Sequence, residues 1–448
     1  MKLKNYSITT IIFILILASC STLATFQYQS GKQSDKSNIA DIASYPLAEI
    51  VVLSDIHLSE LGANEKASTQ KQDDFAKLLN ESSEILKAAV DIISGSPADI
   101  VIIPGDLTEF GEYSNHIRLA QVLAKIAKSG KQVFVVPGNH DIRNFNYVHS
   151  RSGEPQRLVS AEEFSDIYSD FGFKQAISRD SFSLSYVTEP KPGLWLIGLD
   201  SCRYAENTPE HPSQTAGRLS AGTLSWLETN LIRANTEKKA VIVFMHHNLL
   251  EHFKTQKKYF SAYVLENNDE IAEMLAHYNV RLVFTGHYHA EDITIRRTDE
   301  KKFILDIETG SLVSFPCPIR FIRIDSAGDS AFFTSERIES IPSHPSDFAE
   351  FSKKALERAL FENSSYNLKR FGLSDAETNI VSEQAVKGYL AHCEGDEKPP
   401  ANYWDLTGVG CFYGSILDFF TSDLAQGIWH DLPPPDDNIV IDLKTGIW

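Results

Sequence analysis

Five short clusters of aspartate, asparagine and histidine hold the side chains of this sequence that could do chemistry. Each cluster follows closely on a short apolar run. The clusters read Asp55-Ile56-His57, Gly105-Asp106, Gly138-Asn139-His140-Asp141, His246-His247 and Gly286-His287-Tyr288-His289. Carboxylate, amide and imidazole groups are ligands that Mn, Fe and Zn take in hydrolytic sites. They exceed what one four-coordinate ion needs, so they favour a pair of metal ions.

Taken singly, each cluster has a simpler explanation. An Asp-x-His pair is most often two exposed polar side chains, Gly-Asp is most often a turn, and adjacent histidines can be satisfied core groups. Five such clusters in this order, each at the end of an apolar run, are poorly explained by chance. We therefore expect them to converge on one site.

The elements that must position these clusters alternate along the chain. Short apolar, β-branched runs lie at residues 49–53, 100–103, 133–136, 194–199, 241–244, 281–284, 303–307 and 319–324. Residues 72–94, 115–129 and 220–234 carry apolar side chains at helical spacing. Strands that alternate with helices predict an α/β domain. In open α/β sheets, ligands bind outside the carboxyl ends of the strands, where these clusters lie.

The motifs DxH, GD, GNHD, H and GHxH, in this order, resemble the signature of the calcineurin-like metallophosphoesterase superfamily over about residues 47–333. The resemblance implies an α/β fold, a sandwich of mixed β-sheets flanked by helices, around a dinuclear centre of divalent or trivalent metal ions. It implies a first metal held by Asp55, His57, Asp106 and His289, and a second held by Asp106, Asn139, His246 and His287. Asp106 would then bridge the two ions. His247 is the other possible reading of the double histidine, and we expect it to support a ligand instead.

The mechanism expected from such a site depends on the positive charge of the two metal ions. Two cations lower the pKa of a water molecule between them, so that hydroxide forms near neutral pH and attacks phosphorus in line. His140, as an imidazolium, would protonate the leaving oxygen. Glu109, three residues after Asp106, is expected either to orient His140 or to be an exposed acid, and the sequence leaves both open.

The substrate class is narrowed by charge and by departures from subfamily patterns. The formal net charge of −18 disfavours polymeric nucleic acid. Residues 105–111 read GDLTEFG, which lacks the Arg of Ser/Thr protein phosphatases and the metal-binding Tyr of purple acid phosphatases. The remaining resemblance is to class III cyclic-nucleotide phosphodiesterases, so the expected substrate is a small phosphodiester. A cell-surface phosphomonoesterase and a non-catalytic lipoprotein stabilised by metal remain as alternatives.

The N-terminus is expected to be an export signal. Lys2 and Lys4 precede an apolar run at 11–18, which ends before Cys20 in a sequence similar to a bacterial lipobox. We predict a signal peptide at 1–19, a lipidated Cys20 and a flexible tether over 20–46. The protein would then be exported and held at the bacterial cell envelope by its acyl chains alone. A plain signal peptide or a signal anchor is the alternative.

The alternating pattern of the sequence ends at about residue 341. We predict a catalytic domain over 47–340 and a smaller, mainly helical domain over 341–448. A capping box at 374–377 is expected to open a helix that reaches about His392, and 346–361 also has helical spacing. This domain would cap the active site or form a dimer face. The sequence does not decide whether Cys393 and Cys411 pair, nor the oligomeric state.

Overall fold

The computed structural model of the chain describes residues 43–59, 76–146, 157–300, 302–325, 327 and 329–448, apart from the side chains of 411–413 and 416–421. The predicted signal peptide, Cys20 and nearly all of the tether lie outside these residues and stay predictions. None of the described helices combines the length and hydropathy that a bilayer crossing needs.

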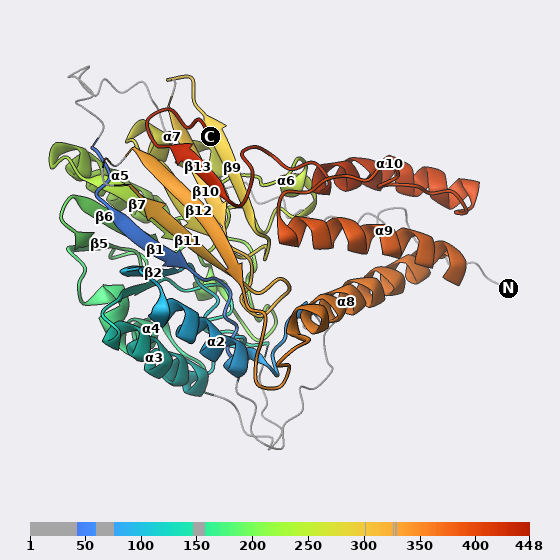
Figure 1. Cartoon of the computed structure of the whole chain (residues 1–448), viewed down its shortest axis with the longest axis horizontal. Helices are drawn as coiled ribbons and strands as arrows, with labels where there is room; N and C mark the ends of the chain where they lie inside the picture. The colour runs from blue at the N-terminus through green and yellow to red at the C-terminus, as the bar shows by residue number, and fades with distance from the viewer. Residues whose placement is uncertain (1–42, 60–75, 147–156, 301, 326, 328) are drawn as a thin grey trace.

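Two mixed β-sheets form the centre of the molecule (Figure 1). The first has the order β13-β12-β11-β1-β2-β3 and the second the order β4-β5-β6-β7-β8-β10-β9. The strands of the first sheet are β1 (Ala48–Val52), β2 (Ile100–Ile103), β3 (Gln132–Val135), β11 (Pro318–Ile324), β12 (Ser330–Arg337) and β13 (Ile439–Asp442). Those of the second are β4 (Ser178–Arg179), β5 (Tyr186–Lys191), β6 (Leu194–Leu199), β7 (Ala240–Met245), β8 (Leu282–Thr285), β9 (Asp292–Arg297) and β10 (Phe303–Glu308). The predicted sandwich of mixed sheets is confirmed.

Parallel pairing aligns the strands that precede the five polar clusters. In the first sheet β1 pairs in parallel with β2, and β2 with β3. In the second sheet β6 pairs in parallel with β7, and β7 with β8. Parallel strands are buried on both faces, which explains their nearly continuous apolar sequences.

The side chains of β7 show how the core is divided. Ile242 and Phe244 point into the main core between the sheets, which also holds residues of β1, β2 and β3. Val241, Val243 and Met245 point to the opposite face and pack with apolar residues of α5 (Ala221–Thr236) and α7 (Asn268–His277). This alternation is the two-residue period of a strand covered on both faces.

The remaining helices flank the sheets much as their sequence spacing predicts. They are α2 (Ser82–Gly95), α3 (Tyr113–Lys128), α4 (Ala161–Ile167) and α6 (Gln256–Tyr259), with a π-helical turn at Ser169–Phe173 and a 3₁₀ turn at Tyr204–Glu206. In α2 the buried residues Ile85, Ala89 and Ile93 recur every four residues and face the main core. The Ser220 hydroxyl caps α5 by accepting the Thr223 N–H.

Three long helices extend to one side of the sheets (Figure 1): α8 (Phe348–Phe371), α9 (Asp375–Glu394) and α10 (Cys411–Ile428). The predicted capping box is confirmed, because the Ser374 hydroxyl accepts the Glu377 N–H while the Glu377 carboxylate accepts the Ser374 N–H. Helix α8 ends at Gly372, whose positive φ of 111° makes a left-handed cap. Cys393 is a free, buried thiol.

The end of this region departs from the prediction of a separate helical domain over 341–448. After α10 the chain returns to the first sheet, where β13 pairs antiparallel with β12 and Ile439 lies opposite Phe333. The alternating burial of β13, with Ile439 and Ile441 inside, reflects this pairing. The strand was missed because a run of four residues, preceded by three prolines, carries little periodic signal of its own.

Candidate metal centre

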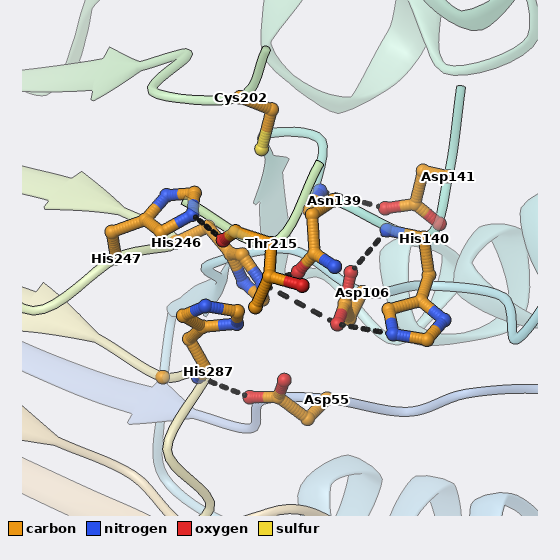
Figure 2. A network of polar contacts seen from close by, with 12 residues as sticks. Asp55, Asp106, Asn139, His140, Asp141, Cys202, Thr215, His246, His247 and His287 are labelled. Atoms are coloured by element: carbon orange, nitrogen blue, oxygen red, sulfur yellow. Dashed lines mark hydrogen bonds and ion pairs between the residues drawn. The ribbon is translucent and has the colours of Figure 1, made fainter. Parts of the chain in front are cut away.

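The five polar clusters meet where β1, β2 and β3 of the first sheet and β7 and β8 of the second reach their carboxyl ends (Figure 2). All nine residues predicted for the site lie within this group of side chains. Three sets of donors come within 4.8 Å of one another: Asp55 with His57 and His289, His57 with Asp106 and His140, and Asp106 with His246 and His287. The structure therefore builds one site from turns that are far apart in the sequence.

Five of these residues have a left-handed backbone conformation, which residues other than glycine rarely adopt. Asp55, His57, Asp106, His287 and His289 have φ values of 52°, 41°, 47°, 76° and 71°. Left-handed backbone at such residues costs of order 1–3 kcal/mol each and persists where the surrounding structure imposes it. Such backbone at five ligand-type residues of one site indicates that the surrounding turns impose the positions of these side chains.

Two glycines allow the turns to approach each other. A Cβ atom on Gly138 would lie 2.1 Å from the backbone nitrogen of Asp106. A Cβ atom on Gly286 would lie 2.0 Å from the Ser54 hydroxyl and 2.4 Å from an Asp55 carboxylate oxygen. Any larger residue at either position would push donor-bearing turns apart.

Asp106 is at the centre of the cluster. Its Oδ2 atom lies 3.3 Å from His246 Nε2, 3.6 Å from His57 Nε2 and 3.9 Å from His140 Nε2. His246 Nε2 also lies 2.9 Å from Asn139 Oδ1. One carboxylate thus contacts donors from both sheets, as a bridging ligand would.

The two best-held histidines direct one nitrogen inward. His246 Nδ1 donates to the Pro104 carbonyl at 3.0 Å, since a carbonyl can only accept. His57 Nδ1 donates to the buried Glu109 carboxylate at 2.8 Å. In both, Nε2 is the nitrogen that faces the other ligand side chains of the site. Metal-binding histidines usually have this arrangement, with the outer nitrogen donating to a carbonyl or a carboxylate.

Among the described residues that make up this centre, two buried metal-ligand atoms lack a hydrogen-bond partner. They are Asp55 Oδ1 and His287 Nε2. Asp55 Oδ2 accepts the His287 N–H at 3.0 Å, while Oδ1 lies 3.2 Å from His289 Nε2. An unpaired buried carboxylate oxygen and imidazole nitrogen are costly unless a cation contacts them. The residues present therefore fit a pair of metal ions.

The electrostatics of the site are those of a cation-binding centre. Burial acts to raise the pKa of Asp106, but His246 and His140 outweigh it and hold that pKa well below its usual range. Burial likewise acts against the Asp55 carboxylate, yet His289 lowers its pKa to about 2. Burial and the neighbouring histidines keep the pKa of His287 well below its usual range, so its ring is neutral and able to bind a metal.

His140 lies at the edge of the centre and is the most exposed of its histidines, with 22% of the side chain accessible. Its Nδ1 donates to the backbone carbonyl of Glu109 at 2.7 Å, so its Nε2 is the nitrogen that faces the site. The Glu109 carboxylate is fully buried and is closer to His57 than to His140, at 2.8 Å against 3.7 Å. Glu109 thus contacts His140 mainly through its backbone, and its side chain supports His57.

His247 is satisfied at both ring nitrogens. Nε2 donates to the Thr215 carbonyl at 2.9 Å and Nδ1 accepts from the Ser201 hydroxyl at 2.7 Å. The ring lies against that of His287, with centroids 4.5 Å apart. These contacts favour the supporting role expected for His247.

Two residues support the site although the sequence analysis assigned them no role: Asp141, which ends the GNHD motif, and Lys77, which lies in no motif. The Asp141 carboxylate accepts backbone N–H groups from Gly138, Leu107 and Thr108, which ties the second turn to the third. Lys77 donates to both oxygens of Glu109 at 2.8 and 3.0 Å. Lys77 and His57 hold the pKa of Glu109 well below its usual range, although burial acts to raise it.

The Lys77→Met substitution is expected to weaken metal binding by about 10-fold, because Lys77 holds the carboxylate that orients His57. Isothermal titration of the metal-free protein with Mn²⁺ would measure this change. Lys87→Met, which alters an exposed lysine of α2, is the matched control and should bind metal normally. Equal affinities in both variants would show that Lys77 does not support the metal site.

Comparisons with known proteins agree with this geometry. A model of the family described as calcineurin-like phosphoesterase matches residues 48–291, more than half of the chain. The chain belongs to the calcineurin-like phosphoesterase family. The match spans all five clusters, and family membership makes the protein a phosphoester hydrolase with a dinuclear metal centre. The resemblance deduced from the sequence is confirmed.

The individual proteins that resemble this chain share only a small part of its sequence. A probable cyclic nucleotide phosphodiesterase of Coxiella burnetii is 25% identical over 248 residues, which cover 55% of this chain and 77% of the relative. A dimetal phosphatase from Danio rerio superposes with a TM-score of 0.44 at 14% identity, over 65% of this chain and 97% of its own. A purple acid phosphatase from yellow lupin (Lupinus luteus) gives a TM-score of 0.42 at 14% identity, over 66% and 53%.

Proposed function

We propose that this calcineurin-like phosphoesterase hydrolyses small phosphodiesters, with cyclic nucleotides as the substrate class. The observation that carries the proposal is the convergence of ligand-type side chains on Asp106, with His140 beside them. A site that only stabilised the fold would need the ligands but not a partly exposed histidine whose Nε2 faces the same point. The non-catalytic alternative gives no reason for His140.

In this proposal the metal ligands are divided as the resemblance implies. Asp55, His57 and His289 would hold one ion, Asn139, His246 and His287 would hold the other, and Asp106 would be shared between them. Bound there, two ions supply a nucleophilic water near neutral pH and offset the charge of the phosphoryl oxygens.

The residues of the chain supply the proton and the orientation. The Glu109 carbonyl fixes the His140 ring by accepting its Nδ1–H, which leaves Nε2 facing the site. A protonated Nε2 at that position donates to the leaving oxygen as the phosphorus–oxygen bond breaks. Asn144 Nδ2 donates to the His140 carbonyl at 3.2 Å and so holds the turn that carries the ring.

Two considerations favour a diester. The Coxiella burnetii relative is named as a probable cyclic nucleotide phosphodiesterase. A diester carries one negative charge, so the two ions are sufficient for it in a strongly acidic protein. The lysine of the site, Lys77, is already paired with Glu109 and adds little net attraction for a dianionic monoester.

The test is a substrate panel on the Mn²⁺-loaded protein. The panel contains 2′,3′- and 3′,5′-cyclic nucleotides, glycerophosphodiesters and nucleoside monophosphates. We expect kcat/KM for at least one cyclic nucleotide to exceed that for every monoester by about 100-fold or more. A preference for monoesters would replace the proposal with a phosphomonoesterase. No hydrolysis by a fully loaded protein would favour a binding role.

A further inference from the structure

A second group of metal-ligand side chains lies outside the phosphoesterase centre, where the end of α9 and the segment after α10 meet β9. Asp292 begins β9, and His392 lies in the last turn of α9. Two sets of donors share Asp292 and lie within 4.8 Å of one another: Asp292 with His392 and Glu397, and Asp292 with Asp431 and Asp436. Asp292, His392, Glu397 and Asp436 are each more than nine-tenths buried.

Carboxylates outnumber basic groups around this cluster. The buried acids Asp306 and Glu308 of β10 and Glu291 add to the five residues of the two sets. Among the described residues, His252 lies 2.7 Å from Asp292 and 3.3 Å from Asp306, and Arg320 pairs with Glu291. His392, itself basic, contacts Glu397 and lies 3.8 Å from Asp292. Burial of this much negative charge is unfavourable unless protons or a further cation offset it.

Four potential metal-ligand atoms of the cluster have no hydrogen-bond partner within the described part of the chain. They are Asp292 Oδ2, His392 Nε2, Glu397 Oε2 and Asp431 Oδ1. The other atom of three of these groups is held in place, because Asp292 Oδ1 contacts His252 and His392 Nδ1 contacts Glu397 Oε1. Anchored ligands that keep unpaired donor atoms are the usual state of a metal site.

The two sets of donors are not equally available. Both carboxylate oxygens of Asp436 already accept backbone N–H groups at 2.7 Å, from Ile293 and Asp396. The set of Asp292, His392 and Glu397 has no such competition for its unpaired atoms, and Asp431 adds a free oxygen beside it. Two carboxylates with one imidazole suit Mn²⁺ or Zn²⁺ better than Ca²⁺, which prefers oxygen ligands alone.

We propose that Asp292, His392 and Glu397, with Asp431 beside them, bind a third divalent cation, Mn²⁺ or Zn²⁺. The excess of buried carboxylates and the unpaired ligand atoms among them support this.

The position of the cluster indicates what such an ion does. Tyr288 separates the ligands His287 and His289, and its ring packs against Phe253 and His392, with centroids 5.7 and 5.6 Å apart. An ion on His392 fixes the end of α9 against the turn that carries two ligands of the catalytic pair. Its role is therefore positional.

The first experiment counts metal ions without measuring hydrolysis. The purified mature chain is stripped with a chelator, reloaded with Mn²⁺ or Zn²⁺, desalted and analysed by mass spectrometry for metal per chain. We expect three ions in the wild type and two in Glu397→Gln. Glu383→Gln, which changes an exposed glutamate of α9, is the matched control and should keep three. Two ions in the wild type, or no difference between the variants, would overturn the proposal.

A second experiment, in a variant that lacks the catalytic metal pair, tests this site on its own. In Asp106→Asn, where the catalytic pair is expected to be lost, one ion should remain, and Asp431→Asn added to it should weaken or remove that ion. Added Mn²⁺ or Zn²⁺ should raise the Tm of Asp106→Asn but not of the combined variant. Asp431 is only half-buried, so this change tests the site even if Glu397→Gln does not fold. A Tm that responds equally in both variants would contradict the assignment.

Discussion

Asp106→Asn is expected to lower phosphoesterase activity by about 10³-fold or more and to remove most of the metal from the catalytic pair. The Asp106 carboxylate contacts the Nε2 atoms of His246, His57 and His140. Asparagine keeps the shape but removes the charge that two cations share, and several kcal/mol of transition-state stabilisation would be lost with them.

The measurement is kcat/KM on a phosphodiester, together with metal analysis of the same sample. Asp91→Asn changes an exposed carboxylate of α2 and should leave both values unchanged. An Asp106→Asn protein that keeps both ions of the pair and full activity would show that Asp106 is no bridge.

His140→Ala is expected to lower kcat by about 10²–10⁴-fold while the metal content stays near that of the wild type. The His140 ring supplies a proton to the leaving oxygen in our proposal and is not among the ligands of either ion. The loss should depend on the leaving group. It should be large for a cyclic nucleotide, whose leaving alkoxide needs a proton, and small for bis(p-nitrophenyl) phosphate, whose phenolate leaves without one.

His211→Ala, at an exposed histidine, is the control for loss of an imidazole. An equal loss on both substrates would argue against proton donation. Loss of metal together with activity would mean that His140 acts as a ligand or in folding.

The sequence was sufficient to predict which side chains come together at the candidate metal centre, because each cluster is a local signal. A polar motif at the end of an apolar strand can be read within a few residues, and parallel pairing then brings such ends together. Asp55, Asp106 and His287 could be found in this way.

The residues that were missed depend on contacts between distant segments. Lys77 reaches Glu109 from a segment without a motif, and its contact follows from the tertiary fold alone. The cluster at Asp292 has the same cause, since His392 and Asp431 come from segments that the sequence leaves unconnected. No spacing rule relates such positions. The same reason explains why the pairing of β13 with β12 could not be predicted.

The pairing of β13 with β12 also sets the order in which the molecule can be completed. Helices α8, α9 and α10 are synthesised between these two strands, so a nascent chain presents the open edge of β12 until residues 439–442 have left the ribosome. An unpaired edge of this kind is a template for pairing with another chain. The three helices are thus an insertion within the hydrolase domain. Cutting the chain at Pro345 would remove β13 from the sheet that holds β1 and β2.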